Sequence, residues 1–378
     1  MCTLLVLLDF SRAFDCINID LLLSKLSYYG LDNSALRWFY SYLTKRHQYV
    51  KLCTSDGSTK VSDNIDLSRG ADISSRITYC KYHIYADDIQ IYITCKPSEI
   101  DSAINKLNMD LANIASWALD NSLMLNPTKT KYLIFGTKTQ LNKIRPTRDV
   151  MLSGELIERV YEARNLGLVM DSELRFEKHV AESVRTCFFR LKLLYNIRPF
   201  INETLRIQLI ETLVLSKLNY MDLVYGPRLL SKTKRLIQRV QNACTRFCFN
   251  VPPRAHVTPF LNKHNILKML HRRKLHLASL LFGIVKHKSP LYLFEKLSWM
   301  STRRSLAVRT CSIQLITPRH ATAAFRGSFK YNATKCWNII PPPLRNLQSV
   351  TSFKTKFKEL ILKHQQSQEV LRHDTSYL

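Results

Sequence analysis

The feature that most constrains the fold is an alternation of apolar and polar residues over residues 82–93, interrupted near its middle by Asp87 and Asp88. Period-2 alternation on both sides of the interruption predicts two antiparallel strands joined by a tight turn that contains the two aspartates. Adjacent carboxylates repel each other unless a cation neutralises them, which makes such a pair costly for a purely structural purpose. The pair at the tip of a hairpin therefore indicates a divalent metal.

A third carboxylate, Asp9, ends a short apolar run over residues 4–8. The run lacks helical spacing, which predicts a strand buried on both faces. If this strand neighbours the hairpin, three carboxylates meet at one end of a sheet, and such a set can hold two Mg²⁺ ions about 3.5–4 Å apart. The alternative is a hairpin turn with solvated aspartates, which are common in turns, and an unrelated aspartate at a strand end.

The chain changes character near residues 172–180. Before this point predicted strands alternate with predicted helices, which cover 18–29, 33–43 and a long amphipathic stretch that opens at Pro97. After it, helical patterns dominate, over residues 177–195, 203–221, 232–249 and 262–286. The expected fold class is therefore α/β (α+β) with an antiparallel sheet, followed by a mostly α-helical region.

Almost all of the excess of basic over acidic residues lies in the second half of the chain. The formal net charge is +27; residues 1–180 contain 22 Lys and Arg against 21 Asp and Glu, whereas residues 181–378 contain 34 against 8. Such an excess favours a polyanionic partner, above all nucleic acid. Cations with aromatic neighbours on helical segments are candidate contacts, and solvated helix faces are the alternative: Arg235, Arg239, Arg246, Arg272, Arg273 and Lys274.

The ten cysteines form no Cys-x-x-Cys pair. Cys244 and Cys248 have helical spacing, which favours buried or free thiols in a reducing compartment, with a zinc site that adds His256 or His264 as the weaker alternative. The apolar run at residues 4–8 is too short for a membrane span or an export signal, so we expect an intracellular protein without a membrane partner.

Four segments, in this order along the chain, resemble motifs of reverse transcriptases. Asp9-Phe10-Ser11-Arg12-Ala13-Phe14-Asp15 and Tyr85-Ala86-Asp87-Asp88 resemble the first and third palm motifs. Residues 123–131 resemble the fourth motif, and residues 165–171 resemble the primer grip. The likeness is strongest to the non-LTR retrotransposon branch, of the jockey-like kind.

The resemblance implies roles for individual residues. Asp9 and Asp87 would bridge two Mg²⁺ ions, for which Mn²⁺ can substitute, with Asp88 as a further metal ligand or a structural acid. Nucleotide-binding residues would be Phe10, Phe14 and Lys129; Phe14 would exclude ribonucleotides by a clash at the sugar 2′ position. Alternatives are an ordinary core Phe14 and a solvated Lys129 beside Lys131. The primer grip would include Asn165, Leu166 and Gly167.

The resemblance also implies domains and partners. Residues 1–176 would form part of a palm, residues 177–250 a helical thumb-like region, and residues 251–378 a basic helical C-terminal region. The activity would be RNA-directed DNA synthesis in the nucleus, with an RNA template, a DNA primer and deoxynucleoside triphosphates as partners.

Two departures from the family predict that catalysis is defective. Met1 lies eight residues before Asp9, so the preceding fingers subdomain is expected to be absent. The Gly-rich second palm motif is missing, because the residues that resemble its two flanks join directly at Gly70-Ala71. The alternative function is a non-catalytic nucleic-acid-binding remnant that acts through the basic half.

Overall fold

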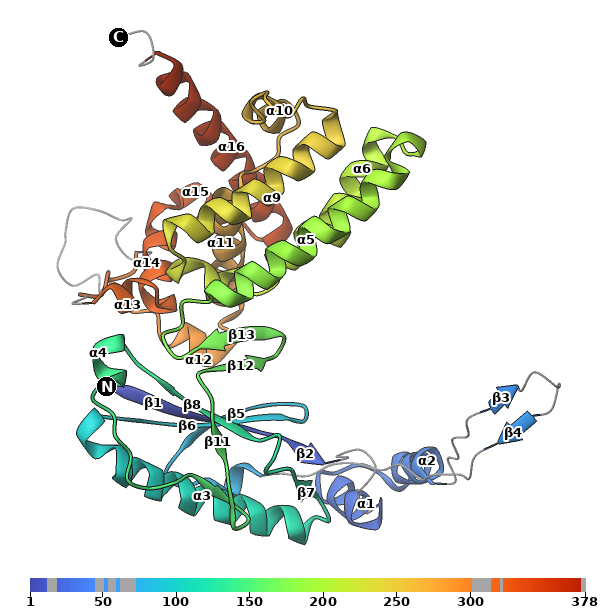
Figure 1. Cartoon of the computed structure of the whole chain (residues 1–378), viewed down its shortest axis with the longest axis vertical. Coiled ribbons are helices and arrows are strands. Elements are labelled where there is room, and N and C mark those ends of the chain that lie inside the picture. The colour runs from blue at the N-terminus through green and yellow to red at the C-terminus, as the bar shows by residue number, and fades with distance from the viewer. Residues whose placement is uncertain are drawn as a thin grey trace. The chain divides into compact units, whose positions relative to one another are not determined.

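The computed structural model describes residues 1–11, 19–44, 51–53, 59–61, 73–300, 314–319 and 322–374. The chain forms two compact units, residues 1–174 and residues 175–378 (Figure 1). The first mixes strands and helices and the second is almost entirely helical, which confirms the expected general class. The Gly70-Ala71 junction and Phe14 lie outside the described residues. The assignment of palm, thumb-like and C-terminal regions stays a prediction.

A five-stranded sheet forms the centre of the first unit, in the order β11-β8-β1-β6-β5. Its central strand β1 (Cys2–Leu8) pairs antiparallel with both β6 and β8. The bounds of the other sheet strands are β5 Lys81–Tyr85, β6 Asp88–Cys95, β8 Lys131–Phe135 and β11 Glu158–Arg159. The hairpin predicted from the alternation is thus the β5–β6 hairpin, and it forms one edge of the sheet.

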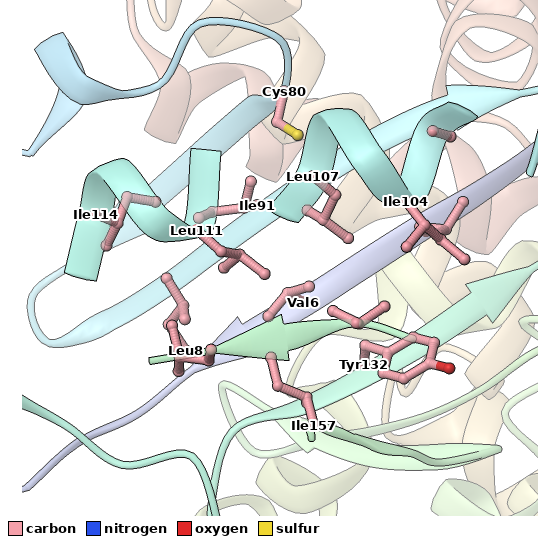
Figure 2. Packing of buried hydrophobic residues seen from close by; sticks show 14 of the residues in the cluster. Val6, Leu8, Cys80, Ile91, Ile104, Leu107, Leu111, Ile114, Tyr132 and Ile157 are labelled. Atoms are coloured by element: carbon pink, nitrogen blue, oxygen red, sulfur yellow. The ribbon is translucent and has the colours of Figure 1, made fainter. Parts of the chain in front are cut away.

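The long amphipathic helix α3 (Ile100–Asp120) packs on one face of this sheet. Its fully buried Ile104, Leu107 and Leu111 contact the strand residues Val6 and Ile91 (Figure 2). The opposite face of β1 is buried as well, since Leu5 and its partner on β8, Leu133, have almost no exposed surface. On this second face Thr3 and Leu7 are only partly buried, so the prediction of a strand buried on both faces is confirmed in part. Asp9 directly follows this strand.

Shorter elements complete the first unit. The predicted helices near residues 18–29 and 33–43 are present as α1 and α2, and neither has a fully buried residue. The bounds are β2 Phe10–Ser11, α1 Ile19–Tyr28, α2 Asn33–Leu43, β3 Lys51–Cys53, β4 Thr59–Val61, β7 Met124–Leu125, α4 Lys138–Leu141, β9 Met151–Leu152, β10 Glu155–Leu156, β12 Glu162–Asn165 and β13 Leu168–Asp171.

The second unit contains helices of very different lengths. Its apolar centre includes Phe282, which stacks on Phe353 with ring centroids 4.4 Å apart, and the fully buried Trp337. The bounds are α5 Glu177–Ile197, α6 Glu203–Leu209, α7 Ser216–Asn219, α8 Asp222–Tyr225, α9 Ser231–Phe249, α10 Thr258–Lys263, α11 Met269–His287, α12 Leu291–Phe294, α13 Ala323–Arg326, α14 Phe329–Ile339, α15 Pro342–Arg345 and α16 Val350–Asp374.

Two of the predicted helices are interrupted. The helix expected over residues 203–221 contains a π-helical stretch at Ile210–Leu215. The single helix expected over residues 262–286 is wrong, because Asn265 adopts a left-handed conformation (φ +53°) and ends α10. Ile266 N–H then donates to Leu261 O at 2.8 Å, the bond that commonly closes a helix at such a residue. Among the described helices, none combines the length and apolar character needed to cross a bilayer.

Candidate active site

Strand pairing places Asp9 at the same end of the sheet as the β5–β6 turn. Leu8, the last residue of β1, pairs with Ile89 of the antiparallel strand β6. Asp9, which follows Leu8, and Asp88, which precedes Ile89, therefore lie at the same strand end. Tyr85 pairs with Asp88, which leaves Ala86 and Asp87 as the two turn residues. The sheet therefore brings Asp9 to the strand end that also carries Asp87, which lies 78 positions later in the sequence.

The loop before β8 holds the backbone of Asp9 on both sides. Asp9 N–H donates to Thr130 Oγ1 at 3.2 Å, and Asn126 N–H donates to Asp9 O at 2.9 Å. Thr130 is fully buried, and its own N–H donates to Asn126 O at 2.9 Å. Sequence analysis missed the role of Thr130, because a buried threonine carries no distinctive pattern. This support fixes the direction in which the Asp9 side chain leaves the sheet.

The three carboxylates act on each other electrostatically. The pKa of Asp88 is raised above its ordinary value by desolvation first, then by the negative charges of Asp87 and Asp9. Oδ2 of Asp9 has almost no accessible surface and no hydrogen-bond partner. Its nearest cation is Lys129 Nζ, at 3.9 Å, and both side chains of this pair are substantially exposed. The strand end thus concentrates negative charge that a cation would neutralise.

The donor chemistry of this cluster suits Mg²⁺, which prefers carboxylate oxygens. Oδ2 of Asp9 is buried, accepts no hydrogen bond and has only the Lys129 ammonium 3.9 Å away, so it can act as an acceptor of the required kind. Within the described ranges, however, no three His, Cys, Asp or Glu side chains are arranged as a ready metal-binding group. The residues present therefore fit a hard divalent cation chemically, and the side chains of Asp87 and Asp88, both exposed, would have to turn toward it.

The turn that carries Asp87 is strained. Ala86 has φ +54°, a left-handed conformation that is unfavourable for a residue with a Cβ atom. Strained backbone conformations of this kind occur preferentially at functional sites. The strain here sets the position of the first aspartate relative to the strand that follows.

The predicted primer-grip residues form a second tight hairpin. Asn165 pairs with Leu168 across the β12–β13 turn, and both turn residues, Leu166 (φ +45°) and Gly167 (φ +77°), have the positive φ that a type I′ turn requires. Gln90 Nε2 on β6 donates to Asn165 Oδ1 at 3.2 Å. This bond ties the hairpin to the strand that begins with Asp88, a link the sequence did not indicate.

Phe10 lies on β2, where it pairs with Leu125 of β7. It is half-buried and packs against the apolar core of the first unit, so the structure gives it a packing contact. A nucleotide contact for Phe10 stays a prediction, and the role expected of Phe14 falls on an undescribed residue.

The six candidate nucleic-acid contacts differ in their surroundings. Arg235, Arg239 and Lys274 are exposed. Arg246 instead donates to Ala255 O at 3.1 Å, and Arg272 forms an ion pair with Glu211. Arg273 lies over the Tyr225 ring, 5.7 Å from its centroid. The three exposed residues are therefore better placed for an external ligand than the three that make internal contacts.

Cys244 and Cys248 are buried in the second unit, in agreement with the expectation of free thiols. Burial is the main cause of a raised pKa at both sites, to about 12 for Cys248. Thiols with raised pKa values are poor metal ligands and poor nucleophiles, because the thiolate is the reactive form.

The antiparallel strands β1 and β6 thus place an aspartate at a strand end beside an aspartate-tipped hairpin, whereas β11 pairs parallel with β8 at the far edge of the sheet. Comparison with known proteins shows what this chain is similar to. The RNA-directed DNA polymerase from mobile element jockey of Drosophila funebris is 27% identical over 145 residues, 38% of this chain and 15% of that protein. The probable RNA-directed DNA polymerase from transposon BS of Drosophila melanogaster is 30% identical over 108 residues, 29% of this chain and 11% of that protein. No protein-family model matches.

Part of this chain is therefore similar to the RNA-directed DNA polymerases of the mobile elements jockey and BS, in agreement with the resemblance of its motifs. The matched regions span less than one sixth of the length of either relative. Both relatives are larger proteins, so activity, substrates and partners do not transfer to this chain directly.

Proposed function

We propose that the first unit carries the carboxylate site of an RNA-directed DNA polymerase. The observation that carries this proposal is the register of β1 against β6, which puts Asp9 beside the aspartate pair at one strand end. The reaction is transfer of a nucleotide to a primer 3′-hydroxyl under the direction of an RNA template. Deoxynucleoside triphosphates are the substrates.

Asp9 and Asp87 would hold Mg²⁺, with Asp88 as an additional acid beside them. When bound, the ions would lower the pKa of the primer hydroxyl and stabilise the charge that develops on the leaving pyrophosphate. The protein's own part is to fix the carboxylates: Thr130 and Asn126 hold the Asp9 backbone, and the strained turn positions Asp87.

Lys129 has two roles compatible with its position. Its ammonium group lies 3.9 Å from Asp9 Oδ2, where it neutralises the carboxylate in the absence of a metal ion. A lysine at this location could also donate a proton to the leaving pyrophosphate. Both roles need an accessible ammonium group, and the Lys129 side chain is mostly exposed.

We further propose that template-directed synthesis is defective in this form. The Gly-rich motif that should lie between the residues flanking Gly70-Ala71 is absent from the sequence. By the resemblance, that motif would pack beside the Phe14 position, where a nucleotide contact is expected, and catalysis of phosphoryl transfer depends mainly on positioning. A protein with these carboxylates but without a complete nucleotide pocket would bind metal ions and would catalyse nucleotide transfer poorly.

Two measurements on the full chain test these proposals separately. Titration with Mn²⁺, followed by its electron paramagnetic resonance signal, should show binding that Asp9→Asn and Asp87→Asn each weaken, while Asp120→Asn, an exposed acid of the same unit, leaves it unchanged. Equal Mn²⁺ binding by the wild type and all three variants would refute the proposal that Asp9 and Asp87 hold the metal ion.

Primer extension on an RNA template, wild type beside Asp87→Ala, tests the defect. We expect neither protein to extend the primer above background. Extension by the wild type that is lost in Asp87→Ala would confirm the polymerase and refute the defect.

A second candidate function is nucleic-acid binding without catalysis, favoured by the confinement of the net positive charge to the second unit. It predicts RNA or DNA binding that depends strongly on salt and survives Asp87→Ala. Binding that disappears with Asp87→Ala would exclude it.

A further inference from the structure

The second unit contains a groove between the first half of α9 and the start of α11. Its volume is about 190 Å³, and its walls include three cations, Lys234, Arg235 and Arg273. Its apolar residues, called the floor here, are Ile237, Met269 and Leu270, and Gln238 completes the lining. A groove with cations at its rim and an apolar floor fits a ligand that has both an anionic group and a flat apolar surface.

The residues that line this groove include no acidic side chain; the nearby acids Glu211 and Asp222 contact Arg272 and His276 of α11. Neither α9 nor α11 contains a single acidic residue. Lys234 and Arg235 are exposed at the edge of the groove, where they are accessible to a ligand. An anion that enters therefore meets no local acidic competitor from the two helices that form the walls.

Arg273 is a preorganised cation rather than a mobile one. Its guanidinium lies 5.7 Å from the centroid of the Tyr225 ring, and Nη1 donates to Gly226 O at 3.5 Å. Gly226 provides the space: a Cβ atom there would lie 2.1 Å from Arg273 Nε. Nε is itself buried and has no hydrogen-bond partner. Fixing one cation in advance reduces the entropy lost when a ligand binds.

The apolar floor is accessible at one point. Leu270 is 53% exposed, whereas Ile237 and Met269 beneath it are buried. Leu270, the exposed residue of the floor, offers an apolar surface against which the face of a nucleobase can be buried. Base faces are available in this way in single strands, whose bases are not held in a paired stack.

We propose that the α9–α11 groove binds one nucleotide unit of single-stranded nucleic acid, with the phosphate between Lys234, Arg235 and Arg273 and the base against Leu270. The proposal rests on the proposed function only for its choice of nucleic acid as the polyanion. The groove gives the second unit a defined site in place of a diffuse positive surface.

The test measures binding of a short labelled thymidine oligonucleotide to the full chain by fluorescence anisotropy. Lys234→Glu combined with Arg235→Glu should weaken binding by about tenfold or more and lower the magnitude of the slope of log K against log salt by about 2, about 1 for each cationic side chain removed. The matched control is Lys356→Glu with Lys358→Glu, which makes the same charge change at exposed positions of α16. The control should bind within about twofold of wild type, since it lies outside the groove.

The role of the base is tested with an abasic strand of the same length. Wild type should prefer the strand that carries bases, and Leu270→Ala should remove this preference, while Leu360→Ala, an exposed leucine on α16, should keep it. Equal weakening by the two charge-reversal pairs, retention of the preference by Leu270→Ala, or equal affinity for duplex DNA would each overturn the proposal. The assay contains neither a metal ion nor a nucleoside triphosphate, so its failure is distinguishable from failure of the polymerase proposal.

Discussion

In the two units, side chains of opposite charge bind backbone groups in loops and near helix ends. In the first unit a buried carboxylate, Asp110, accepts three backbone N–H groups at 2.7–2.9 Å in the loop that leads into β5. In the second unit arginines donate to carbonyls near helix ends, as Arg198 does to Phe247 O at 2.9 Å and Arg246 O at 3.1 Å. Arg206 and Arg345 make similar contacts.

This difference changes how the charge of the second unit is understood. Residues 175–378 contain 36 Lys and Arg against 9 Asp and Glu, whereas residues 1–174 contain 20 of each. Some of the arginines in the second unit have structural partners inside it, so charge alone overstates the number of external contacts. The exposed remainder, such as Arg235 and Arg239, is the part that a polyanion can reach.

The largest expected effect concerns salt. Raising the salt concentration from about 50 to about 200 mM should reduce the affinity of the full chain for nucleic acid by about 10³-fold if six or more phosphates are contacted. Anisotropy titrations at several salt concentrations measure the slope. Asp87→Ala should leave it unchanged, because the first unit has no excess of positive charge. A slope near zero would contradict the inference that the excess positive charge of the second unit binds nucleic acid.

Asp110→Ala tests the acidic support of the first unit. It leaves three backbone N–H groups without their acceptor, and the free energy of unfolding of that unit should fall by about 3 kcal/mol or more. Hydrogen exchange of β6 amides should report the loss, with α11 amides unaffected. Asp101→Ala, which removes an exposed acceptor from the same helix, should cost less. Equal losses would contradict a special role for Asp110.

Leu166→Asn should stabilise the first unit by about 1 kcal/mol. The left-handed conformation that Leu166 adopts in the β12–β13 turn is unfavourable for leucine, whereas asparagine tolerates it. Urea unfolding, monitored by exchange of β13 amides, measures the gain. Leu166→Val is the opposing variant, because a β-branched residue at positive φ should destabilise the hairpin. Stabilisation by both variants would mean that the turn is not strained.

The smallest effect is a pH dependence at Asp88. Because its folded-state pKa lies above the ordinary value of 3.8, the charged form is disfavoured in the folded protein, and Asp88 lowers stability at neutral pH. Asp88→Asn should remove this penalty and raise the stability of the first unit by a fraction of about 1 kcal/mol, since the side chain is largely exposed.

The gain from Asp88→Asn should shrink as pH falls through the raised pKa and vanish below about 3.8, where the aspartate is protonated in both states. Unfolding midpoints at neutral and acidic pH measure it. An equal gain at all pH values would show that packing, not charge, is responsible.

Particular elements show how far sequence patterns reach. Alternation predicted the β5–β6 hairpin, and the apolar run predicted β1, because both patterns reflect burial on defined faces of a sheet. Periodicity located α3, α5 and α9. It failed at residues 264–268, where a left-handed Asn265 ends α10 without a break in the apolar spacing.

By itself, the sequence determined the alternation of strands and helices, the separation of charge and the family resemblance, because these depend on residues close together in the chain. Only the tertiary structure decided that Asp9 lies beside Asp88, that Thr130 supports it, and that Arg272 pairs with Glu211 while Arg235 stays exposed. Strand register and side-chain partnership join residues far apart in sequence, and no local pattern records which distant groups will meet.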